Sequence, residues 1–295
     1  MSLPFYYNVF GVVSIRFREF LAIFGLRRPI KFFPYRLEEQ TISHRSVGEK
    51  RYFYAIWDTP KPMAVRDVQS EVKFYSQFIS PGDTVIDVGA HIGDSTLALA
   101  ICAGVDGHLY AFEPNPATFQ ILAGFCIANK GRLSITPVPW AFGLADELTN
   151  FQYGDYWLDN GGYHEKGVFS HGSTYDVPVK VVTLESFLSV MNLALKDVAF
   201  LKLDCEGMDL DIVETIIAGS RNDVPIIQFE VLDDLFDKEF RLKALASKFQ
   251  LFRVACDPVE GFRLADLDFD VLRSNGQIDV MLVPKEPNID LSSTS

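Results

Sequence analysis

The sequence predicts an α/β protein in which buried strands alternate with helices and deliver polar side chains to one edge of a sheet. A short β-branched strand leads through a glycine turn into a helix at 84–103, and a second strand follows that ends in an acid. Alternation of strand and helix then continues without an internal repeat. The 295 residues can bury a large core, and a hydrophobic fraction of 48% supports a globular protein.

The first strand–turn–helix unit organises the rest of the chain. Val85–Val88 reads as a strand buried on both faces, and Thr96–Ala103 reads as a helix. Gly89 and Gly93 lie between them, where glycine leaves room for a ligand to approach the backbone and amides at the helix start favour an electron-rich group. The alternative is that the glycines serve only a tight turn.

The next strand supplies a carboxylate suited to a ribose. Leu109–Phe112 ends in Glu113, about twenty residues past Gly93, which is where an adjacent parallel strand places an acid for ribose hydroxyls. The glycines are not spaced as in the dinucleotide fingerprint, and residue 91 is His. The pattern therefore favours an adenosine ligand without a pyrophosphate, and S-adenosylmethionine (SAM) is the obvious one.

Charge is distributed unevenly along the chain. The first 66 residues hold 11 basic and 5 acidic side chains, a net charge of +6, whereas the remainder holds 16 and 34, a net charge of −18. The acidic body argues against a nucleic-acid partner. The basic N-terminal region indicates a partner surface.

The N-terminal 33 residues are apolar and aromatic but interrupted by charges. These charges argue against a transmembrane helix, and a signal peptide also fits poorly. The segment is either an amphipathic anchor, with Arg27, Arg28 and Lys31 facing anionic lipid, or a helix packed on the protein's own core or in a homodimer. The next part, with a strand at 51–57, looks like an N-terminal cover.

The four cysteines predict a reducing compartment. None forms a Cys-x-x-Cys pair, and each lies in an apolar run: Cys102, Cys126, Cys205 and Cys256. Buried, reduced thiols are therefore expected, and with them a cytoplasmic location, with peripheral contact at the inner face of a membrane as an extension of that prediction. Nothing resembles a zinc site.

Glu113 precedes a helix and a third strand. Asn115 is expected to cap the helix with Pro116 at its first position, and the helix is expected to run to about Lys130. A strand at 133–138 then leads into a loop, Trp140–Phe142, that lies beside the base in an adenosine-binding sheet. Its aromatic residues either flank the adenine or belong to the core.

Residues 144–180 form the least regular stretch and are rich in glycine and aromatic residues. We interpret them as a substrate-covering insertion, since long loops in compact domains are usually functional or disordered and aromatic residues argue against disorder. The composition loosely suits a sugar or other polyol. His164 and His171 are candidate general bases or simply hydrogen-bond within the loop.

Two later strands again end in acids. Val198–Leu203 precedes Asp204 and Glu206, and the strand from Val224 ends at Glu230. Ligands bind at the carboxyl ends of strands in open α/β sheets, so four acids are expected to border one crevice: Asp87, Glu113, Asp204 and Glu230.

With these residues in hand, the chain resembles the FkbM family of SAM-dependent methyltransferases. The resemblance covers roughly residues 82–230. The motifs that carry it are Val85–Gly93, Tyr110–Pro116, Thr183–Leu184 and Lys202–Gly207. The family commonly has Asn where this chain has His91 and Glu where it has Asp209.

The resemblance implies a class I methyltransferase (Rossmann-like) fold: a seven-stranded mixed sheet of order 3-2-1-4-5-7-6 with the last strand antiparallel, carrying an N-terminal extension over 1–66. The domain would span 67–285 and a polar tail 286–295. It also implies O-methylation of a sugar, glycolipid or natural product, with Asp204 and Glu206 near the transferred methyl. The implied cofactor residues are Asp87, Gly89, Ala90, His91, Gly93, Ser95, Glu113, Pro114, Trp140, Ala141, Phe142 and Asp204.

The proton of the acceptor hydroxyl requires a base, and Asp204, Glu206 or His164 could be that base. A magnesium ion held by Asp204 and Glu230 is an alternative, although three ligands cannot be identified. Two rival functions stay open. One is a non-catalytic module that binds a glycan, lipid or protein, and the other is a nicotinamide-dependent oxidoreductase, which the glycine spacing disfavours.

Overall fold

The structure is a computed structural model of the chain. It describes residues 35–44, 48–57, 67–154, 174–205, 207–220, 223–232, 235–257, 261–270 and 277–285. Several predictions fall outside these ranges: the anchor or dimerisation segment 1–33, the tail 286–295, and the side chains of His164, His171 and Glu206.

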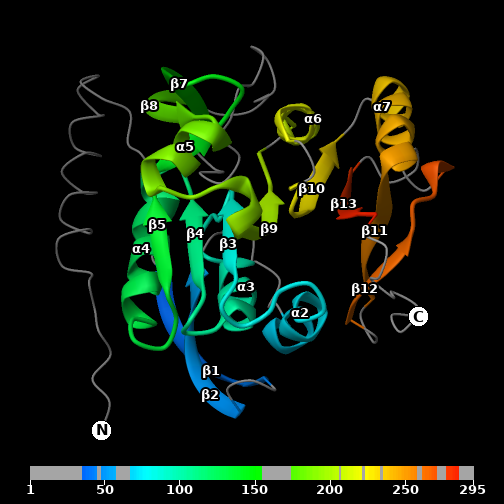
Figure 1. Cartoon of the computed structure of the whole chain (residues 1–295). Coiled ribbons are helices and arrows are strands. Elements are labelled where there is room, and N and C mark those ends of the chain that lie inside the picture. Colours follow the sequence, from blue (N-terminus) through cyan, green and yellow to red (C-terminus); the bar gives the residue numbers. More distant parts are fainter. Residues whose placement is uncertain are drawn as a thin grey trace, which may run out of the picture.

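Within the described residues, the centre of the molecule is an eight-stranded mixed sheet (Figure 1) of order β12-β11-β13-β10-β9-β3-β4-β5. Strand β13 is antiparallel to β10 and β11, whereas β5, β4, β3, β9 and β10 run parallel. The strands are β3 (Thr84–Val88), β4 (His108–Phe112), β5 (Ile135–Val138), β9 (Val198–Leu203), β10 (Ile226–Leu232), β11 (Phe249–Asp257), β12 (Gly261–Asp266) and β13 (Gln277–Pro284).

The sheet has one strand more than the seven expected, because β12 folds back on β11 and becomes the edge. Without β12, the other strands numbered along the chain lie in the order 3-2-1-4-5-7-6.

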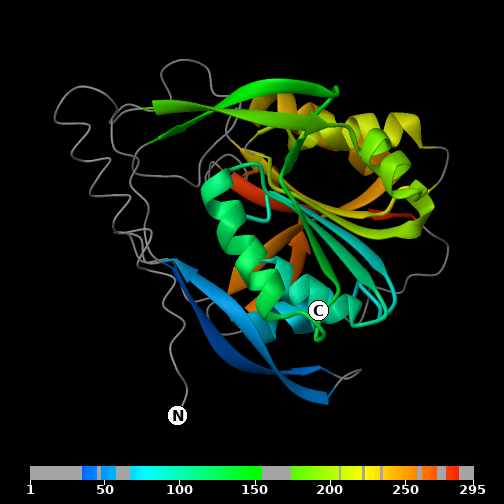
Figure 2. The same cartoon turned by 90° about the vertical axis from the view of Figure 1, so that its left-hand side faces the viewer.

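Helices cover both faces of the sheet (Figure 2). One face carries α2 (Val68–Tyr75), α3 (Thr96–Ala103) and α4 (Pro116–Ala128), and the other carries α5 (Leu184–Met191), α6 (Asp209–Gly219) and α7 (Leu235–Lys248). Successive strand residues alternate between two cores: Val85 packs on the α2–α4 side and Ile86 on the α5–α7 side. The prediction that this strand is buried on both faces is confirmed. Among the described helices, none is long and apolar enough to cross a membrane.

Two local predictions hold at the start of α4. The Asn115 side chain accepts a hydrogen bond of 2.9 Å from the amide of Ala117, and Pro116 occupies the first helical position. This cap fixes where β4 ends and α4 begins, and therefore where the intervening Glu113 lies.

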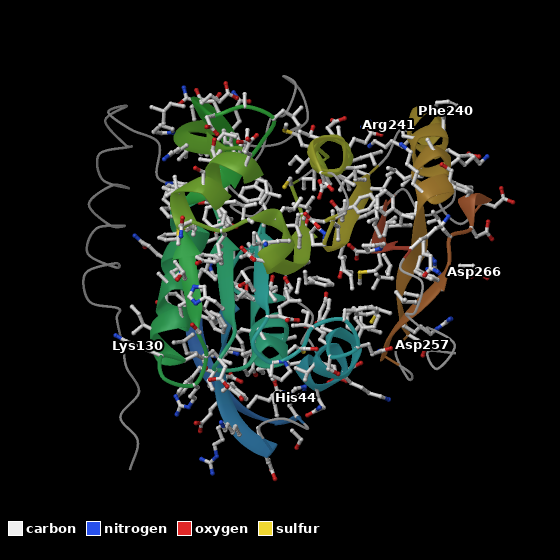
Figure 3. All side chains as sticks on the ribbon, viewed as in Figure 1. His44, Lys130, Phe240, Arg241, Asp257 and Asp266 are labelled. Carbon is white, nitrogen blue, oxygen red and sulfur yellow. The ribbon has the colours of Figure 1, made fainter. Side chains whose placement is uncertain are left out.

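One arginine joins α6 to α7. Arg241 donates from Nη2 to Asp211 at 2.6 Å, and from Nε and Nη2 to the carboxylate of Glu214 at 3.0 and 2.8 Å. Figure 3 shows Arg241 on the side of α7 that faces α6, beside the 76% exposed Phe240. The bidentate geometry aligns these two helices on the sheet.

The N-terminal part contributes a two-stranded hairpin, β1 (Tyr35–His44) and β2 (Gly48–Trp57), that lies against α4 (Figure 2). The sequence predicted only the second strand. Two carboxamides tie the hairpin to the domain. Asn129 bonds both the amide and the carbonyl of Phe53 at 2.9 and 2.8 Å, and Gln69 bonds both backbone groups of Ser43 at 2.9 Å each.

The region after β5 is more regular than predicted. Trp140–Phe142, expected as a loop, is strand β6, and β7 (Glu147–Gly154) and β8 (Thr174–Val182) form the two ends of the expected irregular insertion. They make a separate sheet of order β6-β8-β7. The alternating sequence of Val177, Val179 and Val181 is the signal for β8 that the glycine-rich composition obscured.

Candidate cofactor site

Three neighbouring parallel strands end at the same edge of the sheet. Strand β3 pairs with β9 on one side and with β4 on the other, with Asp87 opposite Lys202 and Val88 opposite Phe112. The segments that follow these strands contain Asp204, the turn 89–93 and Glu113. The three motif regions predicted to lie together are therefore adjacent.

Glu113 is fixed by backbone donors. Its Oε2 accepts from the amide of His91 at 2.9 Å and its Oε1 from the amide of Asn115 at 2.8 Å. The residue is 7% exposed. Burial raises the pKa of Glu113, against the opposing effects of His91 and the two amides. The carboxylate is thus held in one orientation just after the carboxyl end of β4, and it has lone pairs left to accept further hydrogen bonds.

The two glycines of the turn make room for the protein itself. A Cβ on Gly89 would lie 2.1 Å from the backbone oxygen of Asp204, and a Cβ on Gly93 would lie 2.9 Å from the ring of Phe125. Both glycines have positive φ, 76° and 102°. Close packing of the turn on β9 and α4 is thus a reason for glycine here, in addition to any ligand.

Several amides of this turn are already bonded to protein acceptors. Those of Gly89 and Ala90 donate to the carbonyl of Phe112 at 3.0 and 2.8 Å, and that of Gly93 donates to Ala90 at 2.8 Å. These three amides are therefore not available to a ligand. Their bonds fix the turn against the end of β4.

His91 is an ordered part of the turn. Its φ is 51°, which is uncommon for a residue with a side chain, and its Nδ1 lies 2.9 Å from Oδ2 of Asp94. The ring also packs 5.7 Å, centroid to centroid, from that of Trp57 at the end of β2. The N-terminal hairpin thus reaches the turn, which the sequence did not predict.

Asp87 lies inside β3 with 0% exposure rather than at its end. Its Oδ2 accepts from Thr96 Oγ1 at 2.7 Å, and both carboxylate oxygens lie 3.3 Å from Ser95 Oγ. Burial raises the pKa of Asp87, and Lys202 opposes that rise. Asp87 therefore ties the turn and the start of α3 to the sheet. The sequence identifies Thr96 only as the start of a helix. The structure shows that its hydroxyl, next to that of Ser95, also bonds Asp87.

Lys202 neutralises the acids around it. Its Nζ donates to Oδ2 of Asp204 at 2.9 Å, and its side chain is 9% exposed whereas that of Asp204 is 40% exposed. Burial alone would lower the pKa of Lys202, but the carboxylates of Asp204 and Asp87 outweigh burial and hold it above the ordinary value. Lys202 is thus a buried charged group, and the Asp204 side chain beside it is partly exposed to solvent.

Asp209 braces the turn after β9. Its carboxylate accepts from the amide of Cys205 at 3.1 and 3.2 Å and from that of Gly207 at 3.3 Å. Burial raises its pKa to about 6. The first residue of α6 therefore fixes the segment that follows Asp204.

The aromatic residues after β5 separate into two environments. Phe142 is 3% exposed and packs edge-on to Phe112 with ring centroids 4.5 Å apart, so its ring belongs to the core. Ala141 is also buried. Trp140 is half-buried and carries Nζ of Lys180 at 3.8 Å over its ring. Of the three predicted adenine-lining residues, Trp140 is the one with an accessible ring.

Glu230 lies within β10 rather than at its end, is 8% exposed and accepts a hydrogen bond from Nε2 of Gln277. Across the described residues, no group of three or more His, Cys, Asp or Glu is arranged to hold a metal ion. The magnesium alternative thus gains no support, and Glu230 belongs to the β10–β13 pairing.

Comparison with known proteins finds distant relatives. A curated relative, the hexuronic acid methyltransferase AglP of Haloferax volcanii, is 24% identical over 172 residues, which are 57% of this chain and 64% of that protein. One similar solved structure is an O-methyltransferase from Bacillus cereus in complex with SAH, at 13% identity over 75% of this chain and 82% of that chain, with a TM-score of 0.42. Another is a SAM-dependent O-methyltransferase from Thermotoga maritima, at 14% identity over 85% of this chain and 79% of that chain, with a TM-score of 0.38.

The match to a family model is the decisive comparison. The model of the methyltransferase FkbM domain matches residues 87–257, more than half of the chain, and includes the turn, Glu113, Lys202 and Asp209. The chain belongs to the FkbM methyltransferase family.

Proposed function

We propose that the protein transfers a methyl group from SAM to a hydroxyl of a sugar, glycolipid or natural product. The observation that carries the proposal is Glu113, a buried carboxylate that two backbone amides hold at the carboxyl end of β4, beside the glycine turn. A carboxylate in this position can accept hydrogen bonds from both hydroxyls of a ribose.

The other predicted cofactor residues fit different roles. The turn residues Gly89, Ala90, His91 and Gly93 shape the binding surface, and Asp87 acts through Ser95 and Thr96 because its own side chain is buried. Trp140 can present its ring to the adenine, with Pro114 beside Glu113. Phe142 and Ala141 support Trp140 from the core.

When bound, SAM supplies an electrophilic methyl group on a sulfonium. The protein's own task is to align the acceptor oxygen with that carbon, opposite the sulfur, and to take the hydroxyl proton as the C–O bond forms and the methyl–sulfur bond breaks to leave a neutral thioether. Asp204 is the described candidate for the proton acceptor, because its side chain is 40% exposed and Lys202 fixes its orientation. Glu206 and His164 stay predictions for the same role.

A sugar is the acceptor class that we favour. The relative named above is a hexuronic acid methyltransferase, and the aromatic composition of residues 153–175 suits stacking on a sugar ring. The chain spans only 64% of that relative's length, so the relative's substrate is not carried over and the sugar acceptor is proposed for this chain separately.

Calorimetric titration with SAM tests the cofactor assignment. Glu113→Gln keeps the shape but removes the charge, and it should weaken SAM binding by about tenfold or more, since a charge-assisted hydrogen bond contributes about 1.5–3 kcal/mol. Glu185→Gln, at the start of α5, is the matched control and should bind like wild type. Wild-type protein that binds no SAM would overturn the assignment.

Methyl-labelled SAM offered with a panel of hexuronic acids and neutral sugars tests the reaction. Label should move to an oxygen of at least one acceptor. SAM binding without transfer to any hydroxyl across the panel would instead favour the non-catalytic module.

A further inference from the structure

Trp57, the last residue of β2, lies outside the part of the chain that the family model matches. It is 4% exposed and forms a small cluster with Ile92 and Ile121 that is separate from the two main cores. Its ring lies 5.7 Å from that of His91. The hairpin therefore contacts two consecutive residues of the glycine turn.

Strand pairing and two hydrogen bonds to Asn129 hold the strand that carries this tryptophan. Trp57 pairs with Tyr35 at the end of the ten-pair β1–β2 ladder. Four residues before it, the backbone of Phe53 is bonded twice to the fully buried Asn129 at the end of α4. The anchor on α4 fixes β2 relative to the helix that also carries Ile121.

The turn requires support at this point. The positive φ of 51° at His91 costs free energy that neighbouring contacts must offset. The same residue's amide is one of the two donors that hold Glu113. A shift of His91 would therefore release one oxygen of that carboxylate.

We infer that Trp57 is a positioning residue for the cofactor site, because its packing on His91 and Ile92 keeps the His91 amide directed at Glu113. The inference rests on the proposed SAM-binding function. It gives the N-terminal hairpin a role in the site, whereas the sequence suggested a cover, a dimer contact or a membrane segment. A tryptophan that merely fills space would affect stability without affecting the turn.

The experiment compares full-length variants by hydrogen exchange and by calorimetry. Trp57→Leu removes the ring, Trp57→Phe keeps an aromatic ring, and Ile42→Ala opens a cavity in the same hairpin but on β1, where Ile42 is 0% exposed and pairs with Lys50. Exchange is followed in the peptide that covers residues 89–94, without ligand. SAM affinity is measured below the unfolding temperature of each variant.

Trp57→Leu should speed exchange of the 89–94 peptide and raise the Kd for SAM, each by about tenfold, with Trp57→Phe close to wild type. Ile42→Ala should lower the melting temperature with neither effect. Unchanged exchange in a folded Trp57→Leu protein, or equal loosening by Ile42→Ala, would overturn the inference. If wild type binds no SAM, the proposed function fails while the exchange result still decides whether Trp57 holds the turn.

Discussion

Lys202 on β9 lies in register with Asp87 on the neighbouring parallel strand β3, and both side chains are buried on the face covered by α2 and α3. Nζ of Lys202 also reaches Asp204 at 2.9 Å. The ammonium of Lys202 thus compensates one fully buried carboxylate, that of Asp87, and one partly exposed carboxylate, that of Asp204. Breaking such a buried arrangement costs more than it contributes when intact, because the remaining charge has no partner.

Lys202→Met should therefore destabilise the fold by about 3–5 kcal/mol in urea unfolding at pH 8. It should also weaken SAM binding, since Asp87 would lose the cation that favours its ionised form. The pKa of Asp87 is already raised by burial and would rise further. A carboxyl with a raised folded pKa favours the folded state at low pH, so the defect should shrink from pH 8 to pH 5.

Two further variants separate charge from shape at this position. Lys202→Arg keeps the cation and should retain most of the stability, and Lys202→Met combined with Asp87→Asn should recover part of what Lys202→Met loses. A Lys202→Met protein as stable as wild type at pH 8 would show that the lysine compensates nothing.

Gly89 and Gly131 offer a matched test of close approach. Both have positive φ, but a Cβ on Gly89 would lie 2.1 Å from the Asp204 carbonyl oxygen whereas Gly131 has nothing within 4 Å. Gly131→Ala should cost about 1 kcal/mol for the backbone conformation alone. Gly89→Ala should cost several times as much, because β9 and the turn must also separate. Similar losses in chemical denaturation would mean that the backbone conformation, not the contact, dictates glycine here.

The sequence predicts those parts of the site that depend on local chemistry. The strand at 84–88, the Asn115 cap and the acid after β4 are each encoded within a few residues, and the structure has them where the pattern indicates. The register of neighbouring parallel strands then brings Glu113, the turn and Asp204 to one edge.

What the sequence does not reveal is set by contacts between distant segments. The requirement for glycine at position 89 comes from the carbonyl of Asp204, 115 residues away. The burial of Phe142 depends on its packing against Phe112 and Phe187. Trp57 meets His91 from a hairpin that Asn129 ties to the end of α4. In the same way, β12 adds an eighth strand because β11 offers an open edge, which periodicity cannot show.

Asp209 should give the protein a pH-dependent weakness. Its folded pKa of about 6 exceeds the ordinary value of 3.8, so the folded state binds the proton more tightly and loses stability as pH rises from about 4 to about 6. Asp209→Asn should remove that loss. The stability of the variant relative to wild type should increase by about 1–3 kcal/mol between pH 4 and pH 7 in parallel urea titrations. A difference independent of pH would contradict the assignment.

Asn129 and Gln69 make the same pair of backbone hydrogen bonds to the hairpin, but they differ in burial. Asn129 is 0% exposed at the end of α4, whereas Gln69 is exposed on α2. Asn129→Ala would leave the amide and carbonyl of Phe53 without their partner in a site that water reaches poorly, which should cost about 2–4 kcal/mol. Gln69→Ala lets water replace the carboxamide at Ser43 and should cost less than about 1 kcal/mol.

Calorimetric melting of both variants measures this difference in stability. Because Asn129 anchors the strand that carries Trp57, Asn129→Ala alone should also speed hydrogen exchange in the 89–94 turn. Equal destabilisation by the two substitutions would mean that the hairpin is held by its apolar packing rather than by the buried clamp.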